Sequence, residues 1–84
     1  MPAMTVRLLF FAVLRDIAGV DQRELSLSEG TTAREVWHSL RTEFAKLADY
    51  THPPMTAVNE SYAEPDVVLR DGDELAFIPP VAGG

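Results

Sequence analysis

The fold of this chain is organised around its last sixteen residues, LRDGDELAFIPPVAGG (residues 69–84). Residues 71–73 (DGD) predict a tight turn, because the central glycine can adopt positive φ without a Cβ clash. Residues 74–78 (ELAFI) then show the roughly alternating apolar pattern of a mostly buried strand. Pro79 and Pro80 are expected to end that strand, since neither residue has an amide hydrogen for the sheet.

The four residues after the prolines, VAGG (81–84), carry no charge and end in two glycines. Frayed chain ends are common, so one interpretation is a disordered end without a role. The other is a presented carboxylate, because four extended residues reach roughly 13 Å and two glycines form a chain thin enough for a partner's channel. The strand and prolines directly before this segment favour presentation. We therefore predict a flexible tail over residues 79–84.

Composition limits the possible functions. The 84 residues make a single domain (1–84), and 46% of them are hydrophobic, which is enough for one compact core. The net charge of -6 argues against nucleic acid or an anionic membrane as partner. Cysteine is absent and the two histidines have no metal-ligand spacing, so no metal site is expected. No targeting signal or membrane-length apolar run is evident, so a cytoplasmic location is expected.

The first third of the chain predicts a strand, a short helix and a second strand. Residues 4–14 are apolar almost throughout, which predicts a central strand covered on both faces. Phe10 and Phe11 are adjacent, so on a strand their side chains point to opposite faces. Either both are buried within the domain, or one fills the core and the other lies on the outside. Residues 12–18 are expected to form a short helix that ends at Gly19, and residues 20–27 an exposed second strand.

A main helix is predicted after this strand. Thr32 and Glu35 have the spacing of a capping box, and the apolar residues that follow recur every three or four positions: Val36, Trp37, Leu40, Phe44 and Leu47. Residues 56–59 predict a short strand, and Tyr62 follows a turn. One helix among four or five strands predicts an α+β roll with a single covering layer.

Several segments resemble the ubiquitin-like sulfur carriers, and within them the small subunits of molybdopterin synthase (MoaD type). The resemblance is carried by DGDE (71–74), AFIPPVAGG (76–84), LFFA (9–12), LRD (14–16), Gly19 and AVN (57–59). It covers nearly the whole chain in order. It implies a β-grasp fold with a mixed four- to five-stranded sheet covered by one main helix.

The resemblance also implies a function. A ubiquitin-activating-type adenylyltransferase, which binds ATP and Mg, would adenylate the carboxylate of Gly84. Sulfur from a persulfide donor would replace AMP and give a thiocarboxylate. The tail would enter the large subunit of molybdopterin synthase, where sulfur passes to the pterin precursor in molybdenum cofactor biosynthesis. The chain would be non-catalytic alone, and its own residues offer no nucleophile–base set, phosphate loop or metal cluster.

Particular residues receive roles in this interpretation. Gly83, Pro79, Pro80 and Val81 would present the terminal carboxylate, while the resemblance places Phe11 and Tyr62 in a hydrophobic patch that contacts the large subunit. Ile78 is the third candidate for that patch. Compared with typical members, Tyr62 and Ile78 exchange aromatic and aliphatic character, which leaves the patch hydrophobic.

Other functions remain open at this point. The same ending suits a sulfur carrier for thiazole or cysteine biosynthesis, and it suits a ubiquitin-like protein modifier. A plain interaction domain with an idle tail is a third alternative, from a different class. The Pro79–Pro80 pair and the Phe10–Phe11 pair favour the molybdopterin synthase assignment.

Overall fold

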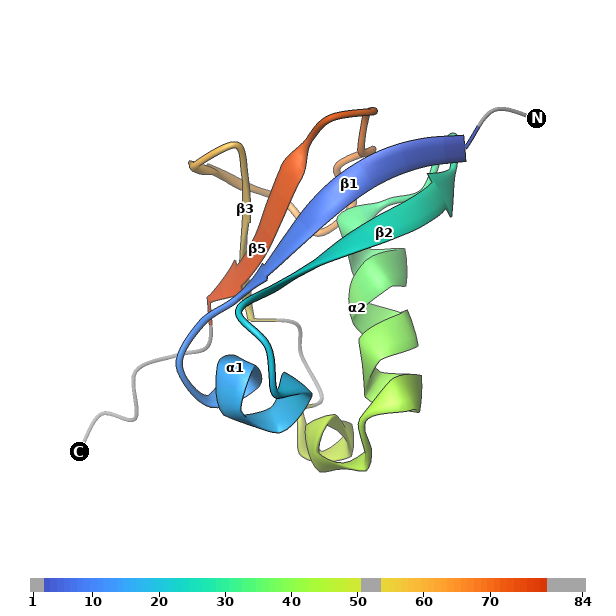
Figure 1. Ribbon diagram of the computed structural model, residues 1–84. Coiled ribbons are helices and arrows are strands. Elements are labelled where there is room, and N and C mark those ends of the chain that lie inside the picture. Colours follow the sequence, from blue (N-terminus) through green and yellow to red (C-terminus); the bar gives the residue numbers. More distant parts are fainter. Residues whose placement is uncertain (1–2, 51–53, 79–84) are drawn as a thin grey trace.

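The computed structural model describes residues 3–50 and 54–78. Their elements, in chain order, are β1 (Ala3–Phe10), α1 (Val13–Ala18), β2 (Gln22–Ser28), α2 (Ala33–Glu43), the 3₁₀ helix η1 (Ala45–Asp49), β3 (Met55–Val58), β4 (Ser61–Ala63) and β5 (Glu74–Ile78) (Figure 1).

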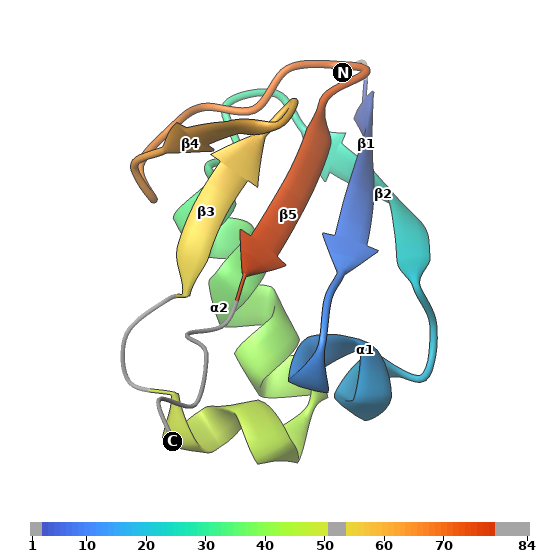
Figure 2. The ribbon, with the colours of Figure 1, turned by 90° about the vertical axis from the view of Figure 1, so that its left-hand side faces the viewer.

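The five strands form one mixed sheet in the order β2-β1-β5-β3-β4. β5 is the central strand and runs parallel to β1 and antiparallel to β3, while the two outer pairs are antiparallel. Helix α2 lies across one face of this sheet (Figures 1 and 2). The predicted α+β class and single main helix are confirmed, and the last strand of the chain holds the two halves of the sheet together.

The core lies between α2 and the sheet. Val6, Leu8 and Leu75 are fully buried on the strands. Trp37 from α2 packs on Phe77 of β5, with 5.2 Å between ring centroids. Aromatic side chains bury large apolar areas, so this contact contributes strongly to the packing of α2 on β5.

The expected two-sided burial of β1 is wrong. Met4, Val6, Leu8 and Phe10 are buried, whereas Thr5 and Arg7 are exposed and Leu9 is half-buried. Strand β1 has a neighbour on each edge, but a helix covers one of its faces only. The nearly unbroken apolar sequence therefore does not reflect burial on both faces, because the apolar residues Leu9 and Phe11 lie on the uncovered side.

Local signals around the helices are confirmed. Gly19 caps α1 with φ of 79° and donates its N–H to the carbonyl of Arg15, and Thr32 and Glu35 form the predicted capping box at the start of α2. Helix α2 ends at Glu43, before the end of its predicted apolar stripe, and the chain continues into η1. No helix of the described residues is long and apolar enough to cross a membrane.

Candidate functional site: the uncovered sheet face

No helix of the described part of the chain covers the sheet face opposite α2 (Figure 2). Cross-strand pairing aligns Leu9 with Ala76, Ala76 with Ala57, and Ala57 with Tyr62. Directly paired residues share a face, so these four side chains form one row across β1, β5, β3 and β4. The row is apolar from end to end.

This row forms part of a concave surface of about 260 Å³, called here the apolar hollow. Phe11 and Tyr62 remain 44% and 73% exposed although both are large and apolar. Exposed apolar side chains gathered in one place mark an interaction surface more often than scattered ones do. The lining residues are Leu9, Phe11, Ala57, Glu60, Tyr62, Glu74, Ala76 and Ile78.

The structure brings together Phe11, Tyr62 and Ile78, which are far apart in the sequence. Their predicted role in binding a partner stays a prediction. Ile78 is the last residue of β5 and the last described residue, and it lines the apolar hollow. The other predicted site residues, Pro79, Pro80, Val81, Gly83 and Gly84, lie outside the described residues.

Sequence reasoning missed the floor of the hollow. Leu9, Ala57 and Ala76 supply it, and the two alanines were unremarkable because small residues carry no strong signal. A period-two count backward from Phe11 and from Ile78 would have found Leu9 and Ala76. Ala57 could not have been found this way, since its place depends on which strands pair.

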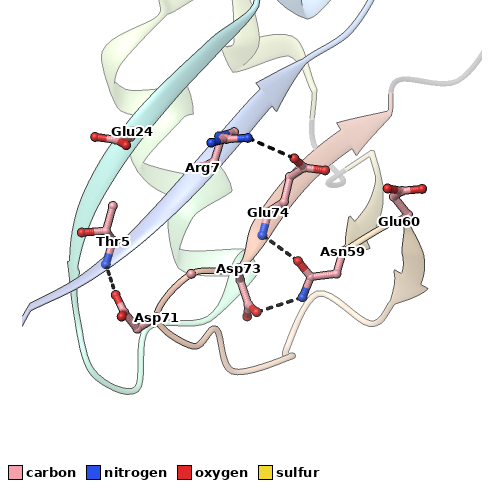
Figure 3. Close-up of a pocket in the computed structure, with 9 residues that line it drawn as sticks. Thr5, Arg7, Glu24, Asn59, Glu60, Asp71, Asp73 and Glu74 are labelled. Carbon is pink, nitrogen blue, oxygen red and sulfur yellow. Dashed lines mark hydrogen bonds and ion pairs between the residues drawn. The ribbon is translucent and has the colours of Figure 1, made fainter.

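A second, polar hollow of about 540 Å³ continues along the same face (Figure 3). It shares Glu60 and Glu74 with the apolar hollow. Its lining is strongly acidic, because it contains five carboxylates and one guanidinium. The lining residues are Thr5, Arg7, Glu24, Asn59, Glu60, Asp71, Gly72, Asp73 and Glu74.

Two of these carboxylates accept hydrogen bonds from backbone N–H groups. Asp71 Oδ1 accepts a 2.8 Å hydrogen bond from the N–H of Thr5. Asp73 accepts from Asn59 Nδ2 at 2.9 Å (Figure 3) and from the N–H of Arg70 at 2.8 Å. These bonds tie the turn before β5 to β1 and to the β3–β4 connection. Asp71 and Asp73 therefore position β5 and have a structural explanation.

The remaining charges on this face are less constrained. Arg7 Nη1 lies 3.7 Å from Glu74 Oε2, an ion pair between partly exposed side chains. The Glu60 side chain makes no hydrogen bond or ion pair with a described residue (Figure 3). Within residues 3–50 and 54–78, no group of three His, Asp or Glu side chains is placed to hold a metal ion.

The groups with clearly shifted pKa values lie away from this face. The hydrogen bonds from Arg23 lower the pKa of the Glu43 carboxyl, and this pair joins β2 to α2. The uncovered face thus combines an apolar surface with charged side chains. Such an arrangement is suited to binding another protein.

Comparison with known proteins agrees with this geometry. The model of the ThiS family matches residues 8–84. A human protein named molybdopterin synthase sulfur carrier subunit is 35% identical, with 99% of this chain and 98% of the human protein aligned. A putative molybdopterin converting factor, subunit 1, from Pyrococcus furiosus superposes with a TM-score of 0.77 at 29% identity, covering 93% of this chain and 99% of that one.

More distant structures share the fold alone. A chain from a complex of subunits 1 and 2 of the molybdopterin-converting factor from Helicobacter pylori superposes with a TM-score of 0.60 at 23% identity, covering 96% of this chain and all of that one. A ubiquitin from Caldiarchaeum subterraneum gives 0.58 at 17% identity, covering 98% and 99%. The fold is therefore the ubiquitin-like β-grasp, as the resemblance implied.

Proposed function

This chain belongs to the ThiS family, and on that premise we propose that it is the sulfur carrier subunit of molybdopterin synthase. The observation that supports the proposal is the position of the apolar hollow relative to the end of β5. An exposed apolar hollow lies at the end of β5, and the sequence that follows β5 ends in Gly83 and Gly84. A partner bound at the hollow can receive the chain terminus at the same time.

The proposed reaction sequence begins at the carboxylate of Gly84. A carboxylate is a poor acyl donor because its leaving group would be oxide or hydroxide, so activation must come first. An adenylyltransferase with ATP and Mg joins the carboxylate oxygen to the α-phosphorus, and pyrophosphate leaves. The terminal sulfur of a donor persulfide then attacks the acyl carbon and AMP leaves. A second thiol cleaves the S–S bond, becoming part of a disulfide and releasing the thiocarboxylate.

The large subunit of molybdopterin synthase is the proposed acceptor, with the active site in that subunit. The apolar hollow would dock on it through Phe11, Tyr62 and Ile78, as buried aromatic and aliphatic anchors do in other interfaces. The two glycines allow close approach to the terminal carbonyl. The similarity to the human protein supports this partner, since that protein is named as a subunit of molybdopterin synthase.

Intact mass spectrometry tests the carrier chemistry. The chain is incubated with ATP, Mg, a cognate adenylyltransferase and a persulfide donor. We expect the mass to rise by about 16 Da, the difference between sulfur and oxygen, on the fragment that contains Gly84. A variant that lacks Gly84 should keep its fold and should not react. Molybdopterin formation by that truncated chain would contradict the proposal.

A pull-down from the organism's own extract separates the related pathways. Co-purification with a molybdopterin synthase large subunit supports the proposed pathway, whereas co-purification with a thiazole synthase supports a different sulfur-transfer route. Lysine-linked conjugates in cells would instead indicate a protein modifier.

A further inference from the structure

The β3–β4 connection has an unusual residue at its second position. Val58 pairs with Ser61, so the turn consists of Asn59 and Glu60 alone. Their φ angles are +52° and +70°, and positive φ at both central residues defines a type I′ turn, for which Asn-Gly is the preferred pair. Asn59 fits this preference. Glycine is favoured at the second position, and Glu60 has a Cβ, so its positive φ carries a local conformational cost.

The polar contacts among the described residues do not explain the choice of Glu60. Its carboxylate makes no hydrogen bond or ion pair with a described residue, in contrast to Asn59, Asp71 and Asp73 around it (Figure 3). Strained residues without a stabilising role are more often found at functional positions. Glu60 also lies where the apolar and polar hollows meet, since it lines both.

We propose that Glu60 is a partner-selecting residue, which pairs with an arginine or lysine of the docked protein beside the apolar side chain that enters the hollow. The proposal rests on the proposed function, because it takes the large subunit as the partner. A charge at the rim of an apolar contact contributes mainly to specificity and association rate. Glu60 would therefore select among partners that all present an apolar surface.

The surrounding charges favour a cation in the partner. Among the described residues, Arg7 is the single basic side chain that lines the polar hollow, and its guanidinium lies near Glu74. One guanidinium offsets only part of the negative potential of the five carboxylates there, to which Glu60 contributes. An acidic partner surface would be repelled here, whereas a basic one next to an apolar anchor complements both hollows.

The test measures affinity and stability together. Dissociation constants for the isolated large subunit of the same organism are measured by calorimetry at low salt and at about 0.5 M salt, beside the melting temperature of each variant. Glu60→Gln removes the charge and should weaken binding by roughly three- to fivefold at low salt, with the difference disappearing at high salt. Glu29→Gln makes the same change of net charge at an exposed residue outside both hollows and should bind like the wild type.

Glu60→Gly gives a second and sharper readout. Glycine suits the positive φ, so the melting temperature should rise while binding weakens as in Glu60→Gln. A purely structural role for Glu60 predicts unchanged affinity in both variants. That result, with normal binding by the wild type, would overturn this inference and leave the proposed function intact. No binding by the wild-type chain would overturn the proposed docking itself.

Discussion

Arg23 and Glu43 form a two-bond ion pair that joins the edge strand β2 to the last turn of α2. Arg23 Nη1 lies 2.8 Å from Glu43 Oε1, and Nη2 lies 3.0 Å from Oε2. The guanidinium also lies over the rings of Phe10 and Phe44, 5.9 and 5.6 Å from their centroids. The Arg23 side chain thus covers two aromatic rings at the edge of the core, on the helix side of the sheet.

The first prediction concerns the pH dependence of this pair. Hydrogen bonding from Arg23 lowers the pKa of Glu43 in the folded chain. Stability from a lowered carboxyl pKa is present above the unfolded value and is lost as the pH falls through the folded value. Glu43→Gln should therefore reduce the free energy of unfolding by about 0.5–1 kcal/mol at pH 7, a range set by the solvent exposure of the pair, and by less as the pH falls.

Urea denaturation followed by Trp37 fluorescence, from pH 7 downward, measures this difference. Glu64→Gln, at an exposed carboxylate without an ion pair to a described residue, serves as the control. A difference between wild type and Glu43→Gln that stays constant down to strongly acid pH would show that the lowered pKa contributes nothing to stability.

The second prediction concerns the turn before β5. Gly72 has φ of +87°, and no heavy atom beyond its two chain neighbours lies within 4 Å of a Cβ placed on it. Gly72→Ala should therefore cost about 1–2 kcal/mol through backbone strain without a steric clash. Gly72→Asn should cost less, because asparagine tolerates the left-handed region. Equal losses for alanine and asparagine in urea denaturation would contradict a purely conformational cause.

The third prediction concerns the start of α2. Thr32 Oγ1 accepts a hydrogen bond from the N–H of Glu35, and Glu35 Oε1 accepts one from the N–H of Thr32. Thr32→Ala should lower the free energy of unfolding by about 1 kcal/mol, while Thr32→Ser should be nearly neutral. Thr42→Ala is the matched control, because that hydroxyl donates to the carbonyl of His38 within the helix. Thermal denaturation of the three variants measures these differences in stability.

The fourth prediction concerns the apolar hollow. Tyr62→Ala and Phe11→Ala remove exposed rings, so the free energy of unfolding should change by less than about 1 kcal/mol. Each should weaken binding to the large subunit at least tenfold, or about 1.4 kcal/mol. Val68→Ala is the control, because Val68 is 54% exposed and lies outside the hollow. Calorimetric titration of all three variants gives the comparison, and equal affinities would remove the hollow from the interface.

The sequence-based interpretation of β1 was wrong for an instructive reason. An apolar run in a strand is expected when both faces are covered, and here the outer face carries Leu9 and lies beside Phe11 without a helix over it. Only the layer arrangement distinguishes a side chain buried inside the domain from one held at an uncovered surface. The same limit applies to Tyr62 and Ile78, whose proximity depends on the strand order β5-β3-β4.

Three local features of this protein could be predicted from the sequence alone. The capping box at Thr32, the helix end at Gly19 and the turn at Gly72 depend on residues close in the chain, and their hydrogen bonds and φ angles follow from neighbours. Only the tertiary structure decided which faces are covered and which distant residues meet. Strand pairing places Leu9 of β1 opposite Ala76 of β5, and a one-residue change of register would turn these side chains to the other face.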